Sequence, residues 1–401
     1  MSGAAAQRAT RLLSLLFFLG LGGAGGFVPY LGLYLERRGL SGAQIGALMA
    51  SMPLARMVAS PLWAAVADKT RMGTRLLQLS GTLATLILVG IFLPLGPVGL
   101  GLVLMAHWAV RAPSGPLLDS AAVRMLERNG LDTAHYGRIR LWGSLGFLVV
   151  GVAGSLTVTP GELPMVPLAL AVCLWALAAA FSFALPVEEG GGPAPFWPAL
   201  RTLGGKPGIG LFLAAAALHG VALNVYDAFF AVHVTSQGLP GWVIGASIAA
   251  GITTEVALLA YGRAVLSRLS PGTLVAVGMA AGALRYGVMA WATAPALVVA
   301  VQTLHGLSFG AFWIGGVEWM RRAAPPTVAA SAQALFNISG YGLGPVLAAL
   351  SAGLLLDGAG TPGLFTLGAG CSAVGALLVA ASEHQRRRAL AAPAGPPAPG
   401  D

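Results

Sequence analysis

The chain has very few charged residues. They make up 9% of its 401 residues, whereas hydrophobic residues make up 56%. A soluble protein carries roughly a quarter charged residues, so this chain cannot cover a water-facing surface. It also has only two cysteines, Cys173 and Cys371, and both lie inside apolar runs. A disulfide framework and a cysteine metal site are therefore not expected.

Other signatures are missing as well. We find no phosphate-binding loop after a strand, no Ser/His/Asp set on soluble elements and no metal-ligand spacing. These absences argue against an ATP-driven pump and against an enzyme, and no cofactor or metal is expected. The glycine-rich run from Gly20 to Gly26 has no strand before it. It indicates close helix packing or a flexible gate.

Long apolar runs are abundant, and a run of roughly 20 residues is enough to cross the hydrocarbon of a membrane. The runs lack the alternation of a β-barrel, so helices are predicted. We place twelve spans, which lie near residues 12–35, 43–66, 76–95, 98–123, 137–158, 164–186, 208–233, 241–262, 272–290, 295–320, 328–353 and 362–381.

One stretch of the sequence recurs. The pattern that begins at Gly39-Leu40-x-Gly42 and ends at Ile45-Gly46-Ala47 returns 199 positions later, from Gly238 to Ala246. It predicts an all-α membrane protein whose twelve transmembrane helices form two pseudo-symmetric six-helix bundles. We expect bundles at 1–186 and 208–385, a cytoplasmic linker at 187–207 and a disordered cytoplasmic tail at 386–401. Repeated halves of this kind usually enclose a solute pathway.

The basic residues predict the orientation. Of the 23 Lys and Arg residues, only Arg37 and Arg38 fall on the side opposite the termini, and Arg56, Arg111 and Arg285 lie inside spans. The positive-inside rule then places both termini in the cytoplasm, and we expect a location in the plasma (inner) membrane. Topology explains the net charge of +9, so no nucleic-acid partner is expected.

Ionisable residues inside the spans are costly in a membrane and usually face a partner or a wet cavity. In the second half, helix 8 carries Glu255, helix 9 Arg285, and helix 10 Gln302 and His305. Helix 7 adds His219, Asn224 and Asp227. A carboxylate, a guanidinium and an imidazole on neighbouring helices are what proton coupling requires. The alternative is a permanent Glu–Arg pair that only fixes helix packing.

The first half carries its own set. The 199-residue offset maps Arg56 of helix 2 onto Glu255, and Arg56 either balances a carboxylate across the halves, binds an anionic substrate, or pairs with Asp119. His107 and Arg111 share one face of helix 4, and the prolines between Arg111 and Asp119 must loosen that helix. Arg140 on helix 5 can pair with Asp119, either in a substrate site or as a structural ion pair.

Several motifs together resemble the phenylpropionate permease-like branch of the major facilitator superfamily, which is close to the lactose–proton symporters. The residues that carry the resemblance are Pro113-x-x-Pro116-Leu117-x-Asp119, Tyr136-Gly137-x-x-Arg140-Leu141-Trp142-Gly143-Ser144, Glu255, Arg285-x-Gly287-x-Met289 and Gln302-x-Leu304-His305. The basic loop after helix 2 also matches. It holds the expected gating residues Asp68, Lys69, Arg71 and Arg75, although Ala64 stands where the superfamily usually has glycine.

The resemblance implies roles for these positions. It implies that Asp119 and Arg140 bind substrate and that Glu255, Arg285 and His305 serve binding and proton coupling. The further helix-10 carboxylate of the lactose symporters is absent, and Ser308 stands in its place. The proton carrier is therefore Glu255, Asp227 or a shared arrangement.

The predicted function is proton-coupled uptake of a small organic solute, and an aromatic or other organic acid is preferred. Alternatives are a sugar or nucleoside symporter, a drug–proton antiporter and a non-transporting membrane sensor. The expected partners are the substrate, protons and the lipid bilayer, and the chain is expected to be monomeric. The full set of predicted substrate residues is Arg56, His107, Trp108, Arg111, Asp119, Arg140, Phe147, Asn224, Gln302 and Trp313.

Overall fold

The computed structural model describes residues 3–70, 72–128, 134–185, 205–325 and 329–391, and this part of the chain is helical without strands. In the first half the helices are α1 (Gly3–Arg37), α2 (Gly42–Thr70), α3 (Gly73–Leu88) with the 3₁₀ segment η1 (Val89–Phe92), α4 (Pro97–Arg111), α5 (Ser114–Arg128), α6 (Ala134–Ser155) and α7 (Met165–Ser182).

The second half has the same style of construction. Its elements are α9 (Ile209–Ser236), α10 (Trp242–Ala260), α11 (Gly262–Leu266), α12 (Pro271–Met289), α13 (Pro295–Val301), the 3₁₀ segment η2 (Gln302–Leu304), the π-helical segment η3 (Gly306–Ala311), α14 (Phe312–Ala323), α15 (Ala329–Asn337), the π-helical segment η5 (Ile338–Leu343) and α16 (Gly344–Ala391). The predicted linker at 187–207 lies almost entirely outside the described residues.

Nine helices in the described residues are long and apolar enough to cross a membrane. The last of them, Ala332–Ala389, is interrupted at Gly360, whose φ of 62° breaks the helix between two predicted spans. Two other predicted spans are helical but fall outside these nine. One is divided between α4 and α5, and the other, α6, has a lower hydropathy because Arg138 and Arg140 lie near its start.

Prolines set several helix boundaries. α4 ends at Arg111 and α5 begins at Ser114, on either side of Pro113. Pro113 offers no N–H for the hydrogen bond of a continuous helix, so the regular helix breaks there, as the sequence predicts. At α12, Ser270 accepts a hydrogen bond from the Thr273 N–H at 3.1 Å, and Pro271 occupies the first turn. Both features favour a helix start.

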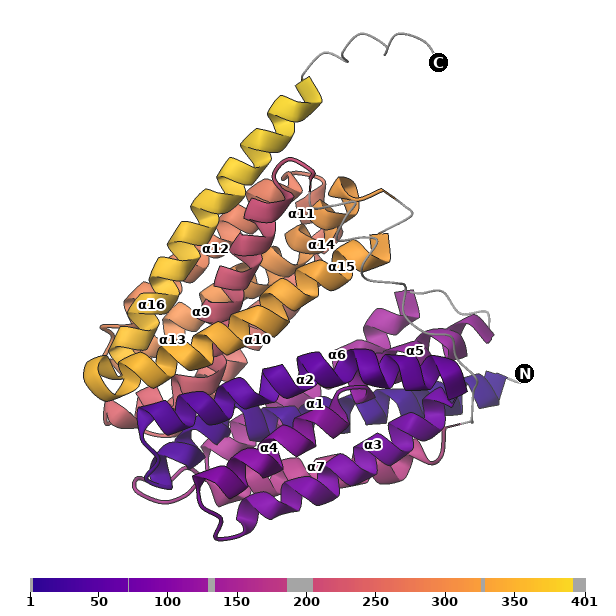
Figure 1. The fold of residues 1–401 in the computed structure, drawn as a ribbon, viewed down its shortest axis with the longest axis vertical. Helices are drawn as coiled ribbons and strands as arrows, with labels where there is room; N and C mark the ends of the chain where they lie inside the picture. The colour runs from indigo at the N-terminus through magenta and orange to yellow at the C-terminus, as the bar shows by residue number, and fades with distance from the viewer. Residues whose placement is uncertain (1–2, 71, 129–133, 186–204, 326–328, 392–401) are drawn as a thin grey trace.

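The apolar core shows how the halves meet. One cluster contains residues of both halves, such as Phe27, Ile45, Phe230 and Ile248. Two further clusters each belong to one half alone. They lie on the side of the molecule where the chain termini lie. The two bundles therefore share a core at the end opposite the termini and diverge toward the termini, as Figure 1 shows.

Glycines allow backbone contact at the shared end. A Cβ at Gly46 would lie 2.5 Å from the Ala349 carbonyl oxygen, and one at Gly241 would lie 2.9 Å from the Val158 carbonyl oxygen. The Asp357 carboxylate also accepts a hydrogen bond at 2.7 Å from the Gly42 N–H, the first residue of α2. Close backbone approach and this cap hold the halves together at one end.

Many large apolar side chains on the outside of the bundles are exposed. Leu354 is 84% exposed, Trp291 83% and Leu377 71%. Exposed apolar surface of this extent marks a contact surface, here the lipid. Beyond the last predicted span, α16 stays helical through Ala391, past residue 385 where the bundle is predicted to end. Residues 386–391 are therefore helical, and residues 392–401 lie outside the described part.

Candidate functional site

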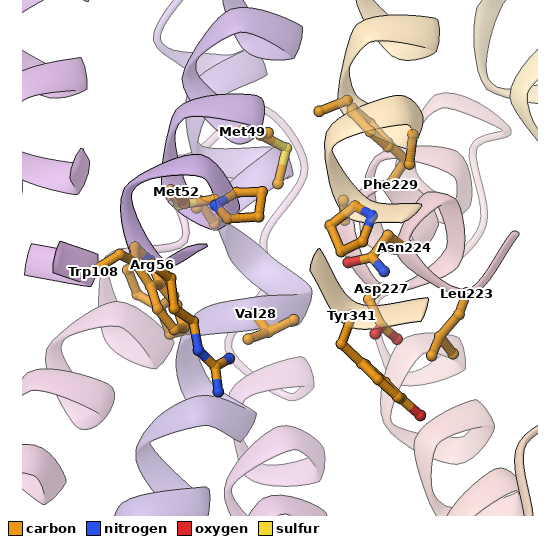
Figure 2. A pocket seen from close by; sticks show the side chains of 17 residues that line it. Val28, Met49, Met52, Arg56, Trp108, Leu223, Asn224, Asp227, Phe229 and Tyr341 are labelled. Carbon is orange, nitrogen blue, oxygen red and sulfur yellow. The ribbon is translucent and has the colours of Figure 1, made fainter. Parts of the chain in front are cut away.

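Two of the cavities between the halves are lined by predicted site residues. The first cavity, of about 200 Å³, is lined by Arg56 and Trp108 from one half and by Asn224, Asp227 and Tyr341 from the other. The second cavity, of about 240 Å³, is lined by Arg140 and Phe147 on one side and by Glu255 and His305 on the other. Asp227 and Tyr341 line both cavities. Figure 2 shows the Arg56 side chain projecting from α2 toward the wall that carries Asp227 and Tyr341.

Arg285 of α12 is the centre of a buried polar network. Its side chain is fully buried. The Nε atom donates to Gln302 Oε1 at 2.8 Å, and Nη1 lies 3.0 Å from His305 Nδ1 and 3.4 Å from Ser308 Oγ. A buried guanidinium is tolerated when its N–H groups have acceptors. Neutral acceptors supply those contacts for Nε and Nη1, whereas Nη2 has no hydrogen-bond partner among the described residues.

Two aromatic rings complete the environment of this guanidinium. The Arg285 Cζ atom lies 4.0 Å from the ring centroid of Tyr226 and 5.1 Å from that of Tyr286. A desolvated cation–π contact contributes roughly 2 kcal/mol. Tyr226 belongs to α9 and Tyr286 to α12, so the rings also fix the position of Arg285 between these helices.

His305 connects Arg285 to the carboxylate of Glu255. Its Nε2 atom lies 3.3 Å from Glu255 Oε2, and its Nδ1 atom faces an Arg285 N–H. Since a guanidinium only donates, Nδ1 must accept, and the imidazole proton therefore resides on Nε2, directed at Glu255. The order Arg285–His305–Glu255 gives a chain of hydrogen bonds that ends in the second cavity.

The backbone around His305, between α13 and α14, is irregular. His305 stands between the 3₁₀ segment η2 and the π-helical segment η3. The Gly306 N–H donates to Thr254 Oγ1 at 3.2 Å, and a Cβ at Gly251 would lie 3.2 Å from the Cβ of His305. Gly251 of α10 and Gly306 of η3 therefore bring α10 and η3 close enough for the His305–Glu255 contact. Such π-helical turns are frequent at functional sites.

Asp227 of α9 stands apart from this chain. Its side chain is half-buried and lines both cavities. Within the described residues it has no hydrogen bond and no ion pair. Asn224, one turn earlier, donates from Nδ2 to the Gly220 carbonyl at 2.9 Å and also lines the first cavity.

The predicted pair of Asp119 and Arg140 is not formed. The Asp119 carboxylate accepts a hydrogen bond from Tyr136 Oη at 2.8 Å instead, whereas Arg140 lies with its Cζ 5.8 Å from the Phe17 ring and lines the second cavity. No ion pair joins Asp119 and Arg140, although both are described. The break after Arg111 places Asp119 on α5 instead of α4. The sequence spacing along one continuous helix therefore does not predict where the Asp119 side chain points.

Some predicted substrate residues lie outside both cavities. His107 is fully buried, with Nδ1 2.8 Å from the Ala84 carbonyl, and Gln302 is fully buried against Arg285. Arg111 stacks on Trp175, with Cζ 4.2 Å from the ring centroid. Trp313 packs against Tyr341, at 5.6 Å between ring centroids. Helical periodicity places these residues on a face but does not distinguish a bundle core from a cavity wall.

The predicted gating loop is only partly described. Lys69 and Arg75 are exposed. The side chain of Asp68 and all of Arg71 lie outside the described residues.

The structure adds polar residues that sequence reasoning did not select. Tyr341 lines both cavities, and its buried hydroxyl has no hydrogen-bond partner among the described residues. Tyr226 and Tyr286 surround Arg285, and Tyr136 holds Asp119. Tyr226 is the sequence neighbour of Asp227 and Tyr286 that of Arg285, and this adjacency to ionisable residues inside a span is the sequence feature that points to them.

Known proteins are similar to this chain in sequence and in architecture. The maltose permease of Geobacillus stearothermophilus is 30% identical over 396 residues, which cover 96% of this chain and 97% of that protein. The probable 3-phenylpropionic acid transporter of Escherichia coli K12 is 26% identical over 306 residues, covering 74% of this chain and 78% of that protein.

Solved structures agree with the fold. The crystal structure of the nucleoside transporter NupG superposes with a TM-score of 0.83 at 21% identity and covers 94% of this chain and 99% of that one. The predictions of an all-α membrane protein and of a major facilitator fold are thereby confirmed. The model of the MFS_1 like family matches residues 10–367. This chain is therefore a multi-pass membrane transporter that belongs to the MFS_1 like family.

Proposed function

We propose that the protein imports a small organic anion with an apolar or aromatic body, together with a proton, by alternating access. The two bundles, 1–186 and 208–385, rock against each other around the cavities. Both termini and the linker at 187–207 face the cytoplasm of a cell whose plasma membrane holds the protein. The single observation that carries this proposal is the hydrogen-bonded chain from Arg285 through His305 to Glu255, which ends in the second cavity.

The chain supports proton coupling because its members differ in what they can do with a proton. Arg285 is permanently charged and only donates. His305 is held with its proton toward Glu255, so a proton that reaches the Glu255 carboxylate from the cavity has a hydrogen-bonded neighbour. Glu255 is 15% exposed and His305 13%, which leaves both within reach of cavity water. A purely structural pair would not need this access.

The basic residues of the cavities support an anionic substrate. Arg56 and Arg140 line the first and second cavity, respectively, and neither guanidinium has a carboxylate partner among the described residues. Trp108 in the first cavity and Phe147 in the second offer apolar surface beside them. Planar, bidentate recognition of a carboxylate is the chemistry to which arginine is suited.

A sugar or nucleoside is the second candidate. The observation that favours it is the 30% identity to a protein named maltose permease over nearly the whole chain. Asn224, Asp227 and Tyr341 also present amide, carboxylate and hydroxyl groups to the first cavity, as in sites that bind hydroxyl groups. The two candidates differ in charge: one proton with a monoanion moves no net charge, whereas one proton with a sugar moves one.

Proteoliposome uptake tests both. Vesicles with an alkaline interior receive 3-phenylpropionate, maltose or uridine, with and without an imposed membrane potential. We expect accumulation of 3-phenylpropionate that follows the pH gradient and does not respond to the potential. Uptake of maltose or uridine that responds to both would favour the second candidate. The proposal of coupling fails if none of the three responds to the pH gradient.

Glu255→Gln provides the matched variant. It keeps the shape and removes the titrating group, so we expect loss of gradient-driven accumulation, by at least about a hundredfold, the range of a removed proton-transfer group. Glu162→Gln, at an exposed loop position, is the control and should accumulate substrate as the wild type does. Equal accumulation by Glu255→Gln and wild type would contradict the role of the chain.

A further inference from the structure

Asp227 occupies a position that no other carboxylate among the described residues shares: it lines both cavities. It projects from α9, near the middle of the molecule, and is half-buried. Neither a hydrogen bond nor an ion pair ties it down within the described part of the chain. A carboxylate in this setting is free to gain or lose a proton without breaking a contact.

The opposite wall of the first cavity carries a cation. Arg56 of α2 projects toward the Asp227 side, as Figure 2 shows, and its guanidinium has no described hydrogen bond or ion pair. A second guanidinium, that of Arg111, lies within electrostatic range of Arg56. The N-terminal wall is therefore positive, and no described carboxylate neutralises it by direct contact.

Other charged and titratable groups surround Asp227. Arg285 of α12 and Glu255 of α10 act on it electrostatically. His305, between η2 and η3, and Arg140 of α6 line the second cavity with it. Tyr226 on its own helix and Tyr341 of η5 complete the surroundings. Arg285 and Glu255 oppose each other in their effect on Asp227.

An anion held by Arg56 would face Asp227 across a small, partly apolar cavity. Two negative charges in such a space repel strongly, because little water separates them. The repulsion disappears when Asp227 takes up a proton. Binding of the anion and protonation of Asp227 thus favour each other, and the linkage is reciprocal.

We propose that Arg56 binds the carboxylate of the substrate and that Asp227 is the group whose protonation is obligatorily linked to this binding. This inference rests on the proposed function in its organic-anion form. The substrate stays ionised on Arg56, one proton adds to a carboxylate oxygen of Asp227, and the loaded cavity carries the same charge as the empty one. The chain from Glu255 to Arg285 then serves as the neighbouring relay, with Asp227 as the group that senses substrate.

Binding measurements separate this proposal from the proposed function. Purified protein in detergent is titrated with 3-phenylpropionate between pH 6 and pH 8.5 by calorimetry. A carboxylic acid with an ordinary pKa of about 4 is ionised throughout this range. We expect the Kd of the wild type to rise with pH, with a limiting slope of about tenfold per pH unit for one linked proton. The neutral analogue 3-phenylpropanamide should show no such slope.

Asp227→Asn removes the linkage. We expect this variant to bind 3-phenylpropionate with a Kd that is constant across the pH range and close to that of the wild type at pH 6. Glu162→Gln, at an exposed position outside both cavities, is the matched control and should keep the slope. If Asp227→Asn retains the slope, Asp227 is not the linked group and the inference is overturned.

Arg56→Gln keeps the test independent of the folding of the Asp227 variant. It should weaken 3-phenylpropionate binding by about tenfold or more and leave 3-phenylpropanamide binding unchanged, because only the anion loses a charge-assisted hydrogen bond. If Arg56→Gln binds neither 3-phenylpropionate nor 3-phenylpropanamide, the proposed contact is overturned. Wild-type binding that does not depend on pH overturns this inference alone, whereas no binding of either probe overturns the organic-anion proposal with it.

Discussion

At the scale of single residues, the contacts of His305 determine what it can do. Arg285 donates to Nδ1 and Glu255 accepts from Nε2, so the two faces of one imidazole meet opposite partners. A second proton on Nδ1 would place an N–H against the Arg285 N–H. The neutral form with its proton on Nε2 is therefore the form that this arrangement stabilises.

Replacing His305 with glutamine tests this assignment. Glutamine can accept from Arg285 and donate to Glu255, but it cannot exchange a proton. We expect His305→Gln to bind substrate within about threefold of wild type and to lose gradient-driven uptake by at least about a hundredfold. Counterflow exchange, which needs no net proton movement, should persist. His384→Gln, at an exposed position of α16, is the control; equal gradient-driven uptake in both variants would refute a proton-transfer role for His305.

At the scale of helices, two π-helical segments, η3 and η5, flank the site. η5 packs on α9 through glycine. A Cβ at Gly220 of α9 would overlap the carbonyl oxygen of Gly340 in η5 and lie 3.0 Å from the Cα atom of Gly344. This close approach places Tyr341 of η5 beside Asp227 of α9, so helix packing and cavity lining depend on the same glycines.

Gly220→Ala should therefore destabilise the bundle. An added methyl group against backbone atoms costs about 1–3 kcal/mol, because the helices must move apart. Gly210→Ala on the same helix is the matched control: nothing lies within 4 Å of the added Cβ, and alanine favours the helix by about 0.5–1 kcal/mol. Melting temperatures in detergent should fall for the first variant and stay level or rise for the second. The same shift in both would show that the contact with η5 is not decisive.

The fold could be predicted from the sequence because it depends on long apolar runs and a repeat, both visible in one dimension. The association of Glu255, Arg285 and His305 could also be anticipated, since charges inside spans need partners. The fate of His107 could not, because its helical face meets the core of its own half. The absent Asp119–Arg140 contact and the role of Tyr136 depend on how α4 and α5 break at Pro113, which spacing does not reveal.

At the scale of the whole molecule, the halves touch at one end and separate toward the other. Polar contacts reinforce the closed end. Asp357 of the second half caps α2 of the first, with 2.7 Å between its Oδ1 and the Gly42 nitrogen. Separation of the halves at this end would break that contact, so we expect Asp357 to stabilise the arrangement in which the halves separate toward the termini.

Asp357→Ala should shift the population away from this arrangement. Loss of a helix cap costs about 0.5–2 kcal/mol, which corresponds to roughly a two- to thirtyfold change in the ratio of the states. Spin labels at Ser41 and Gln237, in a chain whose Cys173 and Cys371 are replaced by serine, report the distance across the closed end. We expect a longer distance to gain weight in Asp357→Ala and much less so in Asp357→Asn, which retains an acceptor. Identical distance distributions for all three proteins would rule out the cap as a latch.

Because the shared core lies at one end only, a small rotation of a helix about that end moves its other end by a large distance. α2 has 29 residues, so it is roughly 44 Å long at 1.5 Å per residue. If it pivots about the joined end by about 10°, its far tip sweeps through roughly 8 Å, by the same geometry. A displacement of that size closes a passage as wide as an aromatic ring. A small rigid-body rotation about the glycine contacts at the joined end would thus be enough to close the opposite end, without any helix having to bend.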